Sequence, residues 1–153
     1  RVIFRILQER KDIEVVAIND INPEINNISY LLNYDTTYGR FHELTKVKDD
    51  YIINSKIKVK VFHYDEISKV PWNECNVDII VDSSGISKNL EKYKYLSDKV
   101  KKIVVTNSPP ANYVDNEIIF GVNQETYDEK KLKANADTKD KHNFVIILIL
   151  VKT

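Results

Sequence analysis

The chain has 153 residues, of which 42% are hydrophobic and 30% are charged. These values are typical of one soluble globular domain and argue against a disordered chain. The 23 basic and 23 acidic residues give a formal net charge of zero. Composition therefore predicts neither a nucleic-acid partner nor binding to an anionic membrane.

Cys75 is the single cysteine, which excludes an internal disulfide and suits a reducing cytoplasm. A reactive thiol and an inert, partly buried thiol are both open, and the inert one is favoured. The three histidines lack the spacing of metal ligands, so no metal site is predicted. The apolar run at 144–151 is too short for a bilayer span of about 20 residues and predicts a buried strand, or a departure at the end of the chain.

The first nine residues predict an amphipathic helix. Its apolar face would hold Val2, Ile3, Ile6 and Leu7, and its polar face Arg1, Arg5, Gln8 and Glu9. In a dinucleotide-binding βαβ unit such a helix follows a strand and a glycine loop. That strand and loop would precede Arg1, so the sequence is expected to lack them.

Residues 13–20 form a short run rich in β-branched side chains that ends on Asp20. This pattern predicts a buried strand. An acidic residue at the end of the second strand of a dinucleotide-binding unit accepts hydrogen bonds from the adenosine ribose. A plain turn or helix-capping role is the alternative for Asp20.

Strands and helices alternate along the rest of the chain. Helices are predicted at 24–34 and 86–96, buried strands at 77–82 and 102–106, a further strand at 118–120, an ordered loop at 34–41, an antiparallel meander on the sheet edge at 44–63 and a mobile lysine-rich segment at 129–141. The pattern predicts an α/β, Rossmann-like fold: a mostly parallel sheet with helices on both faces, lacking the first strand and carrying an added edge hairpin.

Ligands of such sheets bind beyond the carboxyl ends of the strands. The polar and small residues at those ends are Asn19, Asp20, Ser83, Ser84, Gly85 and Thr106. They could line one crevice as cofactor-binding residues. Ordinary turn and capping chemistry is the alternative for the serines and for Thr106.

Seven segments, in order and in register, resemble the NAD-binding domain of glyceraldehyde-3-phosphate dehydrogenase. They are residues 1–5, 12–20, 32–41, 70–72, 77–85, 101–106 and 120–123. The resemblance makes residues 1–128 an NAD(P)-binding Rossmann-like domain, truncated at its N-terminus. Residues 129–153 are a divergent lysine-rich segment with an apolar tail.

The resemblance implies a role for each candidate. Asp20 would hold the adenosine ribose with Asn19 beside it, Ser84 and Gly85 would line the cofactor groove with Ser83 supporting them, and Thr106 would lie near the nicotinamide. NAD is expected rather than NADP, since Asp20 would repel a 2′-phosphate. A complete relative would be a cytoplasmic homo-tetramer acting on a sugar-phosphate aldehyde and phosphate.

Several features depart from that family. The glycine loop and the segment with the nucleophilic cysteine are absent, Cys75 lies in another segment, Asp65 replaces a basic residue near the adenine and Tyr38 replaces a histidine. We therefore expect no catalytic residue and no turnover, and a frameshift or a prematurely ended reading frame would explain the abrupt change. A non-catalytic nucleotide-binding or interaction module and a related sugar-phosphate aldehyde dehydrogenase remain open.

Overall fold

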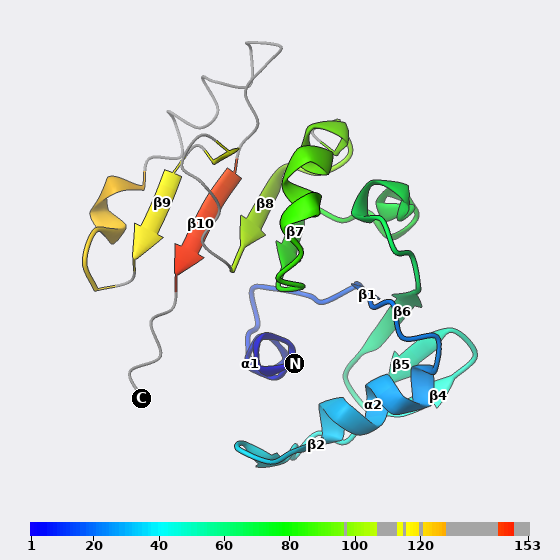
Figure 1. Cartoon of the computed structure of the whole chain (residues 1–153). Helices are drawn as coiled ribbons and strands as arrows, with labels where there is room; N and C mark the ends of the chain where they lie inside the picture. Colours follow the sequence, from blue (N-terminus) through cyan, green and yellow to red (C-terminus); the bar gives the residue numbers. More distant parts are fainter. Residues whose placement is uncertain (97, 107–112, 115, 120, 128–143, 149–153) are drawn as a thin grey trace. The chain divides into compact units, whose positions relative to one another are not determined.

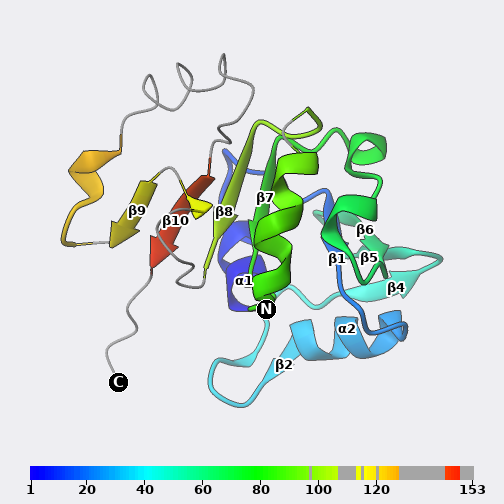
Figure 2. The same cartoon turned by 45° about the horizontal axis from the view of Figure 1, so that its top comes forward.

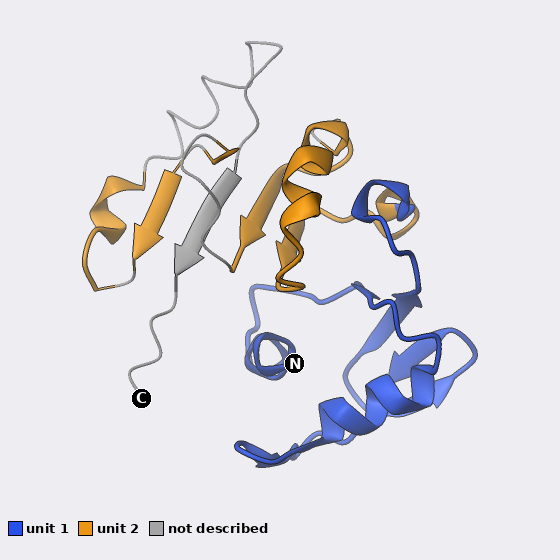
Figure 3. Ribbon diagram, in the orientation of Figure 1, with its two compact units in different colours: residues 1–71 blue, residues 72–153 orange. Residues whose placement is uncertain are grey.

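The computed structural model describes residues 1–96, 98–106, 113–114, 116–119, 121–127 and 144–148. The chain divides into two compact units, Arg1–Pro71 and Trp72–Thr153 (Figure 3). Each unit is described by itself below. The segment 129–141, for which mobility is predicted, lies outside the described residues.

The first unit is built on a mixed four-stranded sheet of order β1-β6-β5-β4 (Figure 1). Strand β1 (Ala17–Asn19) pairs in parallel with β6 (Lys58–Phe62), and β5 (Tyr51–Ile53) and β4 (Lys46–Lys48) continue the sheet in antiparallel order. The predicted meander is confirmed. Its alternation places Val59 and Val61 in the core and Lys58 in solvent, as expected for a sheet with one wet face.

Two helices, α1 (Val2–Gln8) and α2 (Ile25–Asn33), complete this unit. Residues Ile28 and Leu32 lie four positions apart on α2 and are both buried, which is the spacing of one helical face. The core of the unit consists of Phe4, Ile28, Leu32, Phe41, Ile52, Val59 and Val61.

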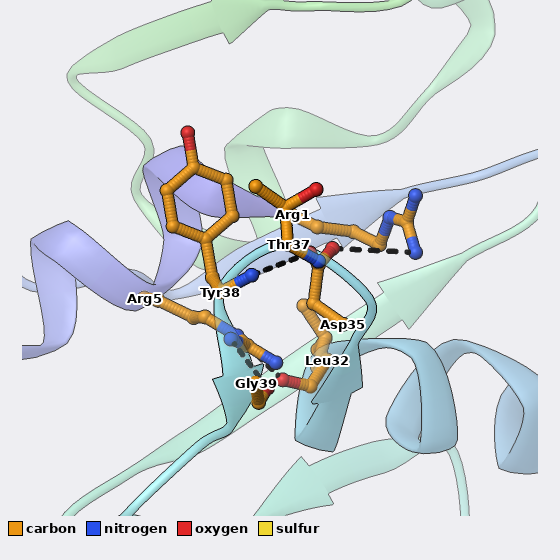
Figure 4. Close-up of polar contacts among 7 residues, drawn as sticks. All are labelled: Arg1, Arg5, Leu32, Asp35, Thr37, Tyr38 and Gly39. Atoms are coloured by element: carbon orange, nitrogen blue, oxygen red, sulfur yellow. Dashed lines mark hydrogen bonds and ion pairs between the residues drawn. The ribbon is translucent and has the colours of Figure 1, made fainter.

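The prediction of which residues α1 buries is wrong. Phe4 and Arg5 are the buried residues of this helix, whereas Ile6 is 55% exposed. The guanidinium of Arg5 donates from Nε to the carbonyl of Leu32 (2.9 Å) and from Nη1 to the carbonyl of Gly39 (3.1 Å), as Figure 4 shows. These bonds, and a position 5.4 Å from the ring centroid of Phe41, make burial of a charged side chain possible.

The segment 34–41, predicted to be a loop, is a short hairpin of β2 (Tyr34–Asp35) and β3 (Gly39–Arg40). Asp35 closes its turn, because Oδ1 accepts from the amides of Thr37 (2.9 Å) and Tyr38 (3.0 Å). Gly39 has φ +67°, a value that glycine adopts without strain. Turn chemistry therefore forms the hairpin, although the segment lacks a strand-like hydrophobic period.

The hairpin predicts an acid-sensitive contribution to stability. Hydrogen bonds from the Tyr38 and Thr37 amides hold the pKa of Asp35 below its ordinary value of 3.8. A carboxyl whose pKa is lower in the folded state stabilises the fold above the unfolded pKa, and this contribution disappears as pH falls through the folded pKa. Urea midpoints of the wild type and Asp35→Ala should therefore differ most at neutral pH and converge below pH 3.8. Asp65→Ala, at an exposed carboxylate, corrects for the change in net charge, and a gap that persists in acid would contradict the prediction.

The second unit holds a parallel four-stranded sheet of order β7-β8-β10-β9 (Figures 1 and 2). Its strands are β7 (Ile79–Asp82), β8 (Lys102–Val105), β10 (Phe144–Leu148) and β9 (Asn116–Ile119). Register pairs Val81 with Val104 and Val104 with Val145. The positions of the strands predicted here are confirmed, and residues 144–148 of the apolar run form an inner strand of the sheet.

The helix predicted at 86–96 is a 3₁₀ helix, η3 (Ser87–Tyr95), rather than an α-helix. A 3₁₀ helix has three residues per turn, so residues three apart lie on one face. Leu90, Tyr93 and Leu96 have that spacing, and all three are buried. Shorter 3₁₀ turns are η1 (Ile67–Lys69), η2 (Trp72–Cys75) and η5 (Gln124–Thr126).

Strands β1 and β7 are less buried than predicted. The residues of β1 are half-buried, and on β7 Ile79 is 52% and Val81 is 38% exposed. Within the described part of the chain β1 pairs only with β6 and β7 only with β8. Each is therefore an edge strand, and edge strands expose more side-chain surface than inner strands.

Candidate cofactor site

Asp20 lies directly after β1, at the carboxyl end of that strand. Its amide donates to the carbonyl of Phe62 (3.0 Å), which extends the pairing with β6 by one residue. Carboxylate Oδ1 accepts from the amide of Asn22 (2.9 Å), whereas Oδ2 has no hydrogen-bond partner in the described part of the structure. The residue is exposed, so Oδ2 can accept a hydrogen bond from a ligand hydroxyl.

Asn19 uses its side chain for a structural purpose. Its Nδ2 donates to the carbonyl of Tyr64 (2.9 Å), and its Oδ1 accepts from the amide of Tyr64 (3.0 Å). This reciprocal pair fastens the segment after β6 to the end of β1. His63 adds a third link, with Nδ1 3.1 Å from the carbonyl oxygen of Asp20. Asn19 therefore holds the backbone beside Asp20 in place, and one Nδ2 hydrogen and one Oδ1 lone pair remain for a ligand.

Residues Ser83, Ser84 and Gly85 follow β7 and are all exposed. Gly85 has φ +71°, and a Cβ at this position would meet nothing within 4 Å. The glycine is thus required by the backbone conformation and not by a crowded neighbour within the chain. A turn of this kind lets a ligand approach the main chain closely.

Beneath this turn lies a buried carboxylate, Asp82, that was not predicted from the sequence as a site residue. Asp82, the last residue of β7, is 7% exposed and accepts four hydrogen bonds. Its donors are the amide and hydroxyl of Ser84, the side-chain amide of Asn89 and the hydroxyl of Tyr93. Burial and the bond to Asp82 raise the pKa of Tyr93, so the phenol stays protonated and donates. Asn89 and Tyr93 follow Asp82 by seven and eleven residues, a spacing that no motif marks in advance.

Thr106 lies just after β8, the strand beside β7. Its amide donates to the carbonyl of Asp82 (3.1 Å), and its hydroxyl lies 3.4 Å from the same oxygen. The end of β8 is thereby held next to the start of the Ser83–Gly85 turn. The structure brings these predicted residues together at neighbouring strand ends.

The six predicted residues fall into two groups. Asn19 and Asp20 belong to the first unit, and Ser83, Ser84, Gly85 and Thr106 to the second. The single crevice lined by both groups remains a prediction, as does a shared role in cofactor binding.

Other chemistry is sparse in the described part of the chain. No group of three or more His, Cys, Asp or Glu side chains there could hold a metal ion. Cys75 is a half-buried cysteine in η2. Within the same residues, no helix has the length and apolar character needed to cross a membrane.

Comparison with known proteins assigns the family. Residues 1–90 match the family described as the NAD-binding domain of glyceraldehyde 3-phosphate dehydrogenase. The chain belongs to this family. Its cofactor is NAD, and its fold is of the Rossmann type. The predicted resemblance is confirmed.

Curated relatives cover most of the chain at moderate identity. Glyceraldehyde-3-phosphate dehydrogenase 1 of Kluyveromyces marxianus is 37% identical over 138 residues, which cover 89% of this chain and 41% of the relative. The enzyme of Shimwellia blattae and the cytosolic enzyme of Trypanosoma brucei brucei are each 34% identical, covering 89% of this chain and 40% of their own length. The chain spans about two fifths of the length of these relatives.

The residues present fit the adenosine ribose of NAD better than its pyrophosphate. The free Oδ2 of Asp20 suits a ribose hydroxyl, and the Gly85 turn suits close approach of a ligand to the backbone. The pyrophosphate of a dinucleotide needs a Gly-x-Gly turn that presents backbone amides. The three glycines of the sequence are Gly39, Gly85 and Gly121, so no such turn occurs in it.

Proposed function

We propose that this chain forms the adenosine-ribose part of the NAD site of a glyceraldehyde-3-phosphate dehydrogenase-like oxidoreductase. The observation that carries the proposal is Asp20, an exposed carboxylate at the carboxyl end of a parallel strand with one unbonded oxygen. An acidic side chain in this place bonds the ribose hydroxyls in dinucleotide-binding units. The Asn19–Tyr64 bonds would hold the neighbouring backbone in place for that contact.

The proposal extends to the whole reaction only for a complete relative. There NAD would accept hydride during phosphorylating oxidation of a sugar-phosphate aldehyde, after attack by a cysteine thiolate. The sequence offers one thiol, Cys75, on η2 rather than in a segment that follows the cofactor domain. We therefore propose that the 153-residue chain contributes cofactor contacts and does not turn over by itself. A cytoplasmic location and a tetrameric assembly are part of the same proposal.

Titration with NAD tests the ribose contact. Asp20→Ala should weaken NAD binding by about 10- to 100-fold, because a hydrogen bond to a charged acceptor contributes roughly 1.5–3 kcal/mol. Perturbation of backbone amide resonances during NAD addition measures this affinity. Asp12→Ala, at an exposed carboxylate of the same unit that pairs with Arg10, is the matched control and should bind like the wild type. Equal affinity of Asp20→Ala and the control would refute the proposal.

The same carboxylate predicts cofactor preference. Asp20 carries a negative charge where the 2′-phosphate of NADP would lie, so NAD should bind more tightly. Titrating the wild type and Asp20→Ala with both cofactors should show this preference in the wild type and a narrower difference in the variant. Tighter binding of NADP than of NAD by the wild type would contradict this assignment.

A further inference from the structure

The turn after β7 rests on a polar network that is buried beneath it. Oδ1 of Asp82 accepts from the amide (2.9 Å) and the hydroxyl (2.6 Å) of Ser84. Oδ2 accepts from Asn89 Nδ2 (2.8 Å) and from the hydroxyl of Tyr93 (2.6 Å). Both oxygens are thus saturated by donors from the turn and from η3.

The carboxylate is stabilised by neutral donors. No Lys or Arg in the described part of the chain forms an ion pair with Asp82, although the residue is only 7% exposed. Asn89 and Tyr93 are also buried, at 8% and 1% exposed. A buried carboxylate is costly unless its hydrogen bonds are satisfied, so these four donors are needed together.

The network determines which polar groups of the turn are bonded within the chain and which are left without a partner among the described residues. The hydroxyl of Ser84 donates to Asp82 and accepts from the amide of Ile86 (3.2 Å) and from Asn89 (3.2 Å). Its amide is also bonded to Asp82. The hydroxyl of Ser83 and the amide of Gly85 have no such partner in the described residues, and both residues are exposed. Ser84 is therefore a support of the turn, whereas Ser83 and Gly85 carry its free polar groups.

We propose that Asp82, together with Asn89 and Tyr93, is a positioning group that holds the Ser83–Gly85 turn in one conformation and leaves the Gly85 backbone and the Ser83 hydroxyl for NAD. This rests on the proposed function for its ligand. It reverses the expected roles of the two serines: Ser84 supports the turn, and Ser83 faces the cofactor. Asp82 contacts no ligand and acts only through the turn.

Amide hydrogen exchange on the full chain tests the positioning without any cofactor. Asp82→Asn keeps the volume of the side chain but turns an amide donor toward one pair of donors. The Ser84 amide should then exchange about tenfold faster or more, while the amide of Ile103 in β8 keeps its wild-type rate. Asp78→Asn, at an exposed carboxylate paired with Lys101, is the matched control and should leave Ser84 unchanged. A wild-type rate at Ser84 in Asp82→Asn would overturn the proposal.

Faster exchange at the Ile103 amide would reveal that Asp82→Asn unfolds the chain. A milder pair of variants then tests whether Ser84 supports the turn. Ser84→Ala removes the acceptor of the Ile86 amide, so that amide should exchange several-fold faster, whereas Ser83→Ala should not change it. Equal rates at Ile86 in the two variants would overturn the inward role of Ser84.

Titration with NAD tests the link to the cofactor separately. Asp82→Asn should weaken NAD binding about fivefold or more relative to Asp78→Asn, because the turn loses its single conformation. Unchanged affinity in Asp82→Asn, with faster exchange at Ser84, would overturn the role in binding and leave only the role in the turn. Failure of the wild type to bind NAD would overturn the proposed function, and the exchange contrast alone would then decide the positioning role.

Discussion

Arg5→Ala should lower the free energy of unfolding by about 2–4 kcal/mol, a large effect for a residue that the sequence places among polar helix positions. Arg5 is 9% exposed and bonds the carbonyls of Leu32 and Gly39. Its removal leaves both carbonyls without this donor and opens space beside Phe41. Urea unfolding at neutral pH measures the loss.

The net effect has an opposing contribution. Nη2 of Arg5 is buried without a hydrogen-bond partner in the described residues, and an unsatisfied buried donor costs free energy that the substitution releases. Arg5→Met separates the contributions, since it keeps an unbranched apolar stem but donates no hydrogen bond. We expect Arg5→Met to recover part of the free energy of unfolding that Arg5→Ala loses. Arg5→Lys should stay less stable than the wild type, because an ammonium group does not reproduce the planar pair of guanidinium donors.

A neighbouring arginine provides the control for this series. Arg40 lies in the β2–β3 hairpin that Arg5 contacts, is exposed, and forms no side-chain hydrogen bond or ion pair in the described part of the chain. Arg40→Ala should change stability by no more than about 0.5 kcal/mol. Equal stability of Arg5→Ala and Arg40→Ala would contradict the role of Arg5 in joining α1 to α2 and to the hairpin.

Burial of Arg5 could not be predicted from the local sequence pattern. Hydrophobic periodicity counts an arginine as polar and therefore assigns it to solvent, although carbonyl acceptors on two other elements allow it to be buried. The same limit hid Asp82, whose donors come from seven and eleven residues further along the chain. Such contacts depend on tertiary placement, which a local pattern does not contain.

Other elements could be predicted because local rules determine them. Alternation of Lys58, Val59 and Lys60 marked a strand with one wet face, and the β-branched run before Asp20 marked β1. The ends of the runs at 13–20, 77–82 and 102–106 also indicated the candidate cofactor residues, whose role in binding stays a prediction. The hairpin at 34–41 was missed because its strands are only two residues long and its turn depends on Asp35 and Gly39.

Adding a strand and a Gly-x-Gly-x-x-Gly turn before Arg1 should raise NAD affinity by about a hundredfold or more. The added turn would present backbone amides to the pyrophosphate, and two or three hydrogen bonds to a charged group contribute roughly 1.5–3 kcal/mol each. A second gain is expected in stability. Strand β1 has only one paired edge among the described residues, so the added strand would find a free edge of that sheet to pair with.

Comparison of two extended chains isolates the contribution of the glycines. One extension carries the glycine turn, and the other has alanine at its three glycine positions, which keeps the added strand but places Cβ atoms where the pyrophosphate would approach. We expect both extensions to raise the urea midpoint and only the glycine version to raise NAD affinity strongly. Neither should oxidise an aldehyde, because Cys75 on η2 is the only thiol in the sequence. Equal NAD affinity of the two chains would show that the glycine turn around the pyrophosphate does not limit binding. The free carboxylate oxygen of Asp20 would then have to account for more of the affinity than one hydrogen bond to a ribose can supply.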